Sequence, residues 1–476
     1  MDPELAPDNQ ELEKFGYKQQ LDRSMGRFSS FAISFSLISI ITGITANFSF
    51  GVQQVGGSII WSWSLVSFGQ FFVALVMADL AVRFPISGYG YQWTSRLTSA
   101  HVGFFVGWFL LMQFITGFPG VCQALAETID FNNVNDDWYI TLVTLGIISL
   151  IALVHLFSIR IVTMVNNGGV YVELLGVALL IILLWGSFVF VSNFDFANLF
   201  DTTNHETDNK AGVSSFALSL LVGAWCLTGF EAAADLAEET RDPCKTVPKA
   251  VIFSLLSAAI AGFVLIGGLL LAADSINLIQ ISKNPLRLIL ESQFGSVVAN
   301  ITVVIILFSI FACGVACMAT ATRLIYSMAR DNMLPFSTYL RRIHPRYKIP
   351  RNATIAVWLL GCLFVVTVRE LSLITSISTV AGYLGYCGII WASMNSVKLK
   401  EKQGSFSLGK YRRLIQTVAL IWTITVVAAL TIPSNVSLGI AHLSAKSTFI
   451  SLMIGITIYF FTIKNRINKG NAGPPN

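Results

Sequence analysis

The chain has 476 residues, of which 54% are hydrophobic and only 12% are charged. Because a soluble chain carries about a quarter charged residues, this composition excludes a set of soluble globular domains and argues against a soluble enzyme. The formal net charge of +5 is too small to indicate nucleic acid as a partner. The seven cysteines contain no CxxC pair, so neither a disulfide framework nor a zinc site is predicted.

Twelve apolar runs follow one another along the chain, each about as long as a helix that crosses roughly 30 Å of hydrocarbon. They predict an all-α polytopic membrane protein, because only helices and closed barrels satisfy their backbone groups in lipid and no barrel-like alternation is present. The first 28 residues contain no apolar core, which excludes a cleaved signal peptide. The predicted spans are 29–51, 58–82, 101–129, 138–159, 163–192, 212–236, 250–273, 296–326, 352–368, 371–394, 413–432 and 446–463.

Lysine and arginine are distributed unequally between the two sides that these spans define. Of the 31 basic residues, 26 fall on the side of the N-terminus, and the other side holds only Lys210, Lys283, Arg287, Arg369 and Lys446. The positive-inside rule therefore places both termini in the cytoplasm. The bias also supports an even number of spans, since one missed helix would invert every later loop. We expect a multi-pass protein of the plasma (inner) membrane, with the lipid bilayer as its surroundings.

The first and sixth spans each contain a glycine with polar neighbours near the middle of the membrane. Gly43 lies in the sequence SIITGIT and Gly229 lies in WCLTGFE, at matching places in two blocks of five spans. Matched interruptions of this kind are typical of inverted-repeat carriers, whose substrate binds at the broken helices. Unwinding frees N–H groups that favour a carboxylate and carbonyls that favour an ammonium. Close helix packing is the alternative role for each glycine, but the matched pair favours two breaks.

The predicted organisation follows from these blocks. Residues 1–28 form a cytoplasmic tail, 29–192 the first five-helix repeat and 212–394 the second. Two further helices occupy 413–463, and 464–476 form a cytoplasmic C-terminal tail.

Three motifs stand in order along the chain. ADLAVRFP with SGYGY spans Ala78 to Tyr91, GFE with EETRDP and VPKA spans Gly229 to Ala250, and ATRLIYSMARD with LP, P and IPRNA begins at Ala321 and ends at Ala353. With these motifs the chain resembles the amino acid–polyamine–organocation superfamily of permeases, closest to its amino acid/choline transporter group, over nearly its whole length. The resemblance implies a five-plus-five inverted-repeat fold with twelve helices, broken helices one and six, and secondary active transport by alternating access.

The resemblance also implies a substrate site. In the family, amides of the first break hold the substrate carboxylate, an aromatic gate covers the substrate, and carbonyls of the second break receive its amine. The corresponding residues are Thr42, Gly43 and Ile44 for the carboxylate, Trp225 for the gate, and Cys226, Leu227 and Gly229 for the amine, with Gln113, Gly117, Cys313 and Ser378 or Tyr383 along the walls.

Glu173 is the main candidate for energy coupling, because it lies within span five about a third of the way across the membrane. An ionisable residue at mid-helix costs about 2.5–3.5 kcal/mol, and low-dielectric surroundings favour its neutral form. We therefore predict that Glu173 takes up and releases a proton. In several relatives a lysine that mimics a bound sodium ion stands here, so this chain departs from them; an oxygen ligand for Na⁺ and a structural glutamate are the alternatives. Glu231 is a second candidate, with capping of a half-helix as its alternative role.

Four charged residues near the cytoplasmic ends of spans are predicted to form an inner gate: Asp79, Arg83, Arg323 and Arg330. The first two stand one turn apart and should pair with each other. The two later arginines can pair with Asp235, Glu238 and Glu239, although charges at a membrane rim are often only solvated.

These features predict a secondary transporter, not an enzyme, that imports an amino acid by proton symport and uses no cofactor or metal beyond the coupling H⁺, with Na⁺ as the alternative ion. A choline, ethanolamine or polyamine carrier, an amino acid exchanger and a non-transporting nutrient sensor remain alternatives. A channel would need a sustained polar stripe, which no span shows. The sequence specifies neither the substrate side chain nor the oligomeric state.

Overall fold

The computed structural model describes residues 6–129, 137–157, 159–190, 195–204, 209–210, 212–282, 284–396, 405–432 and 438–475. Parts of two predicted spans, residues 158 and 191–192, lie outside these ranges, as do Lys283, Lys398, Lys400 and Lys402 of the charge count.

The described residues are helical apart from loops and one antiparallel pair of two-residue strands, β1 (Thr203–Asn204) and β2 (Asn209–Lys210). The helices in chain order are α1 Ala6–Glu13, α2 Arg27–Ile38, α3 Ile40–Val55, α4 Ile59–Arg83, α5 Tyr89–Leu97, α6 Ala100–Ile129, α7 Asp137–His155, α8 Ile159–Phe190, α9 Val213–Cys226, α10 Ala232–Asp235, α11 Pro243–Leu271, α12 Ile276–Ile281, α13 Pro285–Arg330, α14 Ser337–Leu340, α15 Arg351–Thr367, α16 Leu371–Asn395, α17 Arg412–Thr431, α18 Leu438–Ile458 and α19 Lys464–Asn468. Short turns are η2 Gly56–Ser58, η3 Phe196–Phe200, η4 Ala237–Glu239, η6 Gly409–Tyr411 and η7 Tyr459–Ile463.

Within the described ranges, nine helical segments are long and apolar enough to cross a membrane, and α9 and α15 are shorter apolar helices. The first segment, Arg27–Arg83, contains α2, α3 and α4 in succession. The protein is therefore an all-helical polytopic membrane protein, as predicted. Predicted spans 29–51 and 212–236 overlap the interrupted pairs α2–α3 and α9–α10. Of the other ten, nine overlap a long apolar helix and 352–368 overlaps the shorter α15.

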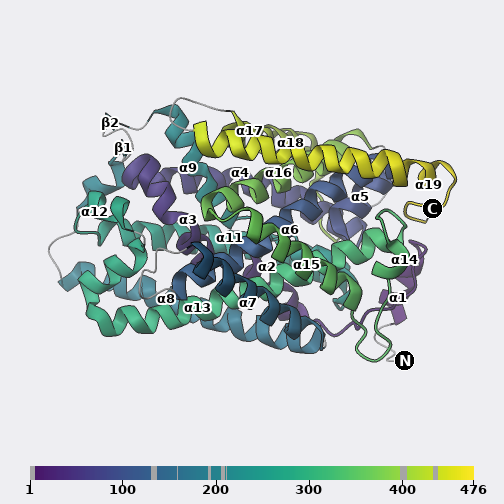
Figure 1. The fold of residues 1–476 in the computed structure, drawn as a ribbon, viewed down its shortest axis with the longest axis horizontal. Helices are drawn as coiled ribbons and strands as arrows, with labels where there is room; N and C mark the ends of the chain where they lie inside the picture. Colours follow the sequence, from purple (N-terminus) through teal and green to yellow (C-terminus); the bar gives the residue numbers. More distant parts are fainter. Residues whose placement is uncertain are drawn as a thin grey trace.

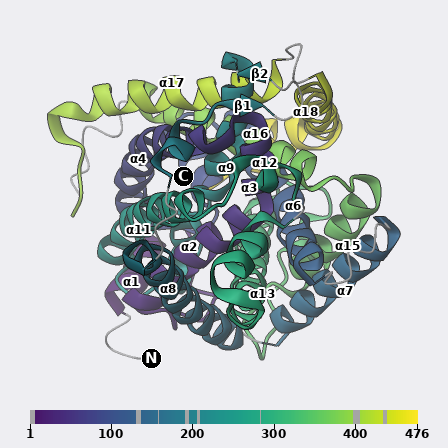
Figure 2. The same cartoon turned by 90° about the vertical axis from the view of Figure 1, so that its left-hand side faces the viewer.

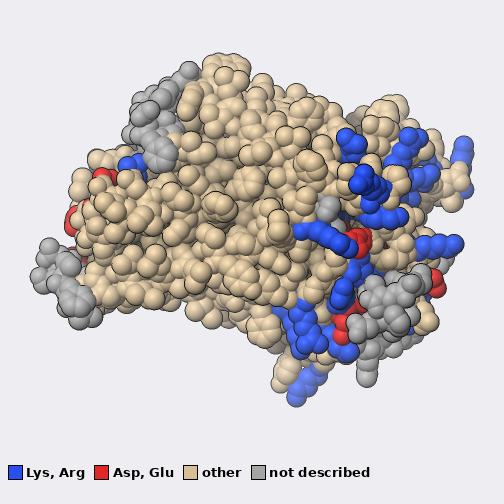
Figure 3. Space-filling model, turned by 90° about the horizontal axis from the view of Figure 1, so that it is seen from below, with Lys and Arg blue, Asp and Glu red and all other residues tan. Residues whose placement is uncertain are grey.

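The helices form one elongated bundle, with the first and last helices, α1 and α19, at the same end of the molecule (Figure 1). Seen from the opposite end, α2, α3 and α9 lie in the middle and are surrounded by α4, α6, α8, α11 and α13 (Figure 2). Lysine and arginine side chains gather at the end that holds α1 and α19, which we call the basic end. On the face shown, the middle of the molecule is a belt without charge (Figure 3). Large apolar side chains such as Leu142, Phe308 and Ile421 are more than half exposed, which suits contact with hydrocarbon rather than water.

Two interruptions divide the central helices. The chain leaves the helix between Cys226 and Ala232, where Gly229 has φ +97°, so the second predicted break is found at its predicted glycine. The first break is at Ser39, with φ 33° and ψ 95° between α2 and α3, and the prediction of a break at Gly43 is wrong. The helix α3 is continuous through Gly43, whose N–H donates to the carbonyl of Ser39 (2.9 Å). Ser39 also caps the new helix, because its Oγ accepts from the N–H of Thr42 (3.3 Å).

Candidate functional site

A cavity with an empty volume of about 390 Å³ lies between the two interruptions. Helices α2, α3, α6, α9, α13 and α16 and the α9–α10 connection form its wall. No lining residue carries a charge, so any charge on a bound molecule must be met by backbone dipoles or by groups behind the wall. The lining residues are Leu37, Ile38, Thr42, Gln113, Phe114, Gly117, Val121, Trp225, Thr228, Gly229, Cys313, Cys317 and Ser378.

Half of the predicted substrate residues lie at this cavity: Thr42, Gln113, Trp225 and Gly229. Gly117, Cys313 and Ser378 also line it, whereas Tyr383 does not. Gln113 lines the cavity, and its side-chain Oε1 is buried without a hydrogen-bond partner among the described residues.

The other four predicted residues, Gly43, Ile44, Cys226 and Leu227, are buried away from the cavity. Gly43 and Cys226 pack directly on each other across the α3–α9 contact, because a Cβ atom at Gly43 would collide with Cys226. The thiol of Cys226 lies 3.6 Å from the carbonyl of Ile38, and the carbonyl of Leu227 accepts from Gln70 Nε2 (3.1 Å). Cys226 therefore joins α9 to the first broken helix, and Leu227 joins it to α4. The helix-packing role of Gly43 is the one that its surroundings support.

The carboxylate of Glu173 reaches the N-terminus of α3. Its Oε1 accepts from Ser39 Oγ (2.9 Å) and from the N–H of Ile41 (3.4 Å), and the residue is 1% exposed. A helix N-terminus is the positive end of the helix dipole and favours an anion. The positive end of the first break, which the family resemblance assigns to a substrate carboxylate, is therefore occupied by a carboxylate of the protein itself.

Two hydroxyl groups connect Glu173 with the cavity. Ser39 Oγ lies 2.9 Å from Glu173 Oε1 and 2.6 Å from Thr42 Oγ1, and Thr42 lines the cavity. Because each hydroxyl can both donate and accept, the chain of hydrogen bonds can run in either direction. The protonation state of Glu173 can thus set whether Thr42 donates or accepts toward the cavity.

Glu231 stabilises the second break. Its Oε2 accepts from the N–H of Gly229 (3.1 Å) and its Oε1 accepts from the hydroxyl of Tyr386 on α16 (2.7 Å). The residue is fully buried. These contacts satisfy a free amide of the unwound segment and tie it to α16. The side chain makes no capping hydrogen bond to the half-helix α10, so the capping role considered for Glu231 is not the one seen.

The four predicted gate residues form ion pairs at the basic end. Arg83 donates to Asp79 (Nη2–Oδ1 3.1 Å), and Arg412 joins the same carboxylate (3.3 Å). Arg323 pairs with Glu239 (Nε–Oε1 2.7 Å) and Arg330 pairs with Glu238 (Nη2–Oε1 2.9 Å). Both later arginines lie on α13 and pair with η4, so they hold the segment that follows the second break.

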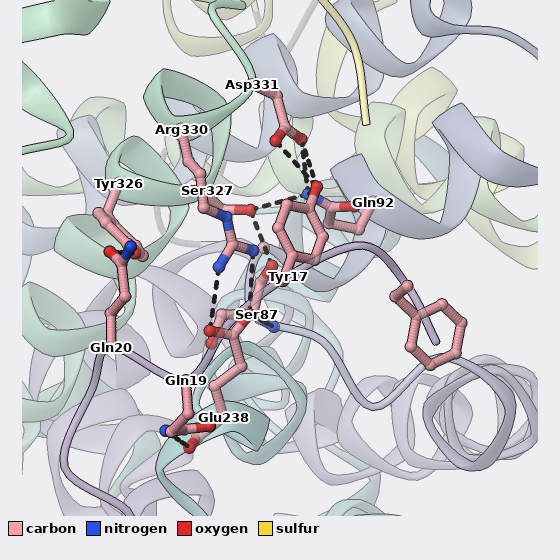
Figure 4. A network of polar contacts seen from close by, with 12 residues as sticks. Tyr17, Gln19, Gln20, Ser87, Gln92, Glu238, Tyr326, Ser327, Arg330 and Asp331 are labelled. Atoms are coloured by element: carbon pink, nitrogen blue, oxygen red, sulfur yellow. Dashed lines mark hydrogen bonds and ion pairs between the residues drawn. The ribbon is translucent and has the colours of Figure 1, made fainter. Parts of the chain in front are cut away.

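The N-terminal segment before α2 lies against the Arg330–Glu238 pair, a contact that the sequence did not predict (Figure 4). The hydroxyl of Tyr17 donates to Asp331 (2.8 Å), which also accepts from Gln92 Nε2 (2.7 Å). Gln19 Nε2 donates to the carbonyl of Glu238 (2.8 Å). Burial raises the pKa of the Asp331 carboxyl, while the neighbouring Arg330 charge and the donated hydrogen bonds lower it. The segment fastens α13, α5 and η4 together at the basic end.

We expect Gly43→Ala to destabilise the protein by about 1–3 kcal/mol, the usual effect of overpacking a tight contact, because the added methyl group meets Cys226. Thermal unfolding of the purified protein in detergent measures the effect. Cys226→Gly in the same chain should recover most of the loss. Gly146→Ala on α7 is the control, since a Cβ there meets no atom within 4 Å; equal destabilisation by both alanines would contradict the contact.

Comparison with known sequences places the chain in a family. The sequence profile of the amino acid permeases matches residues 25–460, which is most of the chain and includes both interruptions and the cavity. The chain belongs to the amino acid permease family. This permease is therefore a membrane transporter and not an enzyme, as the sequence analysis predicted.

Relatives of the permease align over most of their own length. It is 27% identical to the amino-acid permease BAT1 of Arabidopsis thaliana, with 96% of this chain and 94% of the relative covered. It is 26% identical to a BAT1 homolog of Oryza sativa subsp. japonica, over 89% of this chain and 87% of the relative. It is also similar to the thiamine transporter thi9 of Schizosaccharomyces pombe, at 23% identity over 88% of this chain and 79% of that protein.

Proposed function

We propose that this permease imports an amino acid together with a proton across the plasma (inner) membrane by alternating access. In this proposal the chain crosses the membrane twelve times, with both termini in the cytoplasm and with residues 29–192 and 212–394 as inverted five-helix repeats. The names of the relatives and an uncharged cavity between two interrupted helices support an amino acid, whose opposite charges need dipoles rather than counter-ions.

The observation that carries the proton coupling is the hydrogen-bonded chain from Glu173 to Thr42. When Glu173 is ionised, Ser39 donates to it and Thr42 donates to Ser39, so Thr42 offers only acceptor capacity to the cavity. When Glu173 is protonated, it donates to Ser39, Ser39 donates to Thr42, and the Thr42 hydroxyl donates into the cavity. A substrate carboxylate needs that donor. The proton and the amino acid therefore stabilise each other's binding, which is the requirement for symport.

The geometry of the site supports the proposed roles of α9, Trp225 and the gate pairs. The C-terminus of α9 is the negative end of a helix dipole beside Trp225 and Gly229, and it suits the substrate ammonium. Trp225 covers the bound substrate from the wall of the cavity. Release toward the cytoplasm requires the pairs of Arg323 and Arg330 to separate from η4, so that α9, α10 and α2 can move against α13.

A carrier for an organic cation is the second candidate, and the place of Glu173 favours it. An ionised carboxylate directly behind an otherwise uncharged wall would attract a cation, and one relative is named a thiamine transporter. Such a substrate has no carboxylate for the Thr42 donor, so the two candidates predict opposite effects of protonating Glu173.

Uptake into proteoliposomes tests the proposal. A panel of labelled amino acids, choline, ethanolamine, a polyamine and thiamine should show accumulation of at least one amino acid when the external side is acidic, and an imposed sodium gradient alone should have no effect. Accumulation of cations only, or a strict need for Na⁺, would contradict proton-coupled amino acid import. Binding without uptake of any compound would favour a nutrient sensor.

A further inference from the structure

A second concave site opens on the outer surface at the basic end, between α2 and α11, with an empty volume of about 780 Å³. It shares no lining residue with the cavity between the interruptions. Basic and aromatic side chains dominate it, and no acidic residue lines it. Those side chains are Arg27, Phe28 and Phe31 from α2 and Lys245, Lys249 and Phe253 from α11.

Two of the three cations are available for a ligand. Arg27 and Lys249 are exposed, and neither has a hydrogen-bond or ion-pair partner among the described residues. Lys245 pairs with Asp242 at 3.2 Å. Because an ion pair near the surface contributes only about 0–1 kcal/mol, a ligand can replace this contact. The groove therefore presents at least two uncompensated positive charges.

The cations and the rings lie in a fixed order along both helices. On α11, Lys245, Lys249 and Phe253 are four residues apart, so they share one face and each lies about 6 Å further from the basic end than the one before. On α2, Arg27 is the first helical residue and Phe28 and Phe31 follow within the next turn. Phe253 is 57% exposed and Phe28 is 37% exposed. The positive charges of the groove thus lie nearer the basic end, and its exposed apolar surface lies further along the helices, toward the middle of the bundle.

We propose that this groove binds one anionic phospholipid of the leaflet that faces the basic end, with its phosphate between Arg27 and Lys249 and an acyl chain along Phe28, Phe31 and Phe253. Charge complementarity selects an anionic headgroup, since a basic pocket at a membrane surface attracts anionic lipids. The rings add an apolar surface that free phosphate does not use. Because α2 ends at Ile38 and its last residues line the cavity between the interruptions, a lipid fixed to α2 and α11 also restrains one wall of that cavity.

The test uses the full-length protein in detergent, titrated with dioleoylphosphatidylglycerol or dioleoylphosphatidylcholine and monitored by native mass spectrometry. We expect one phosphatidylglycerol to bind with higher affinity than phosphatidylcholine. Each cation at an anionic lipid surface contributes about fivefold in affinity, so Arg27→Gln with Lys249→Gln should weaken phosphatidylglycerol binding by about 25-fold and leave phosphatidylcholine binding unchanged.

The controls separate this groove from general attraction to the basic end. Arg342→Gln with Lys469→Gln removes two exposed cations elsewhere at that end and should leave the first lipid's affinity unchanged. Lys249→Gln alone, expected to weaken binding about fivefold, serves if the double variant is poorly folded. Inorganic phosphate should not displace the lipid at equal concentration. Equal binding of both lipids, equal loss in the control variant, or displacement by phosphate would each overturn the proposal.

Discussion

Glu173→Gln is expected to abolish substrate accumulation driven by a pH gradient while exchange of internal for external substrate continues. Glutamine cannot release a proton, yet its amide can donate to Ser39 as a protonated glutamate does. The variant therefore resembles the permanently protonated state, in which Thr42 donates toward the cavity. One proton per substrate supports about tenfold accumulation for each pH unit of gradient, so the accumulation ratio should fall from about 10 to about 1 at a gradient of one unit.

Two comparison variants make this result specific. Thr42→Val keeps the shape of the side chain and removes the last hydroxyl between Glu173 and the cavity, so it should weaken substrate affinity as well as coupling. Glu291→Gln changes a half-exposed carboxylate on α13 and should transport as the unmodified protein does. Gradient-driven accumulation that persists in Glu173→Gln would remove this residue from the coupling mechanism.

The same variant distinguishes the two candidate substrate classes. If the substrate is an amino acid, its affinity for Glu173→Gln should be retained and should no longer depend on pH. If the substrate is an organic cation, the affinity should fall, because the variant loses the negative charge behind Thr42. Equilibrium binding of the accumulated compound, measured at two pH values, gives this distinction without any gradient.

The sequence was sufficient for the helices and for the second break, because the signals for both are local. A run of apolar residues of membrane length is read from neighbouring positions, and the backbone at Gly229, with φ +97°, is one that glycine adopts without steric penalty. The positions of Gln113, Gly117 and Val121 on one face of α6 follow equally from helical spacing, so the cavity wall on this helix could have been extended to Val121 from Gln113 alone.

The first break could not be placed in the same way, because a distant residue holds it. Ser39 adopts φ 33°, which a non-glycine residue rarely does without compensating contacts. Those contacts come from Glu173, 134 positions away in the sequence. Gly43, on which the predicted break was based, is explained by packing instead: a larger residue at this position would collide with Cys226.

The contacts of the N-terminal segment could not be predicted either, because they too join residues that are far apart in the sequence. Tyr17 contacts Asp331 across 314 positions, and a charged tail before the first span has the composition of a solvated segment. Arg323 and Arg330 could be assigned to a gate because a buried arginine near the membrane surface needs an acidic partner. The two glutamates of η4 were the nearest candidates in the motif. Only the folded structure shows which arginine pairs with which glutamate.

Arg323→Met is expected to destabilise the protein by about 3–5 kcal/mol, the usual effect of removing one partner from a buried ion pair. Arg323 is 2% exposed and Glu239 is fully buried, so the glutamate would keep a charge without a partner. Adding Glu239→Gln should recover much of the loss, since it removes that charge. Chemical unfolding of the purified protein in mixed micelles measures the three variants against the unmodified chain.

The control and the functional consequence follow from the same geometry. Arg287→Met breaks a partly exposed pair with Glu291 and should change the unfolding free energy by less than about 1 kcal/mol. Because the Arg323–Glu239 pair joins α13 to the segment after the second break, its loss lowers the stability of the form that is closed at the basic end more than that of an open form. Substrate efflux from loaded proteoliposomes should then rise relative to influx in the Arg323→Met, Glu239→Gln protein. Full stability of Arg323→Met alone would mean that Glu239 has another partner and that this pair does not hold the gate closed.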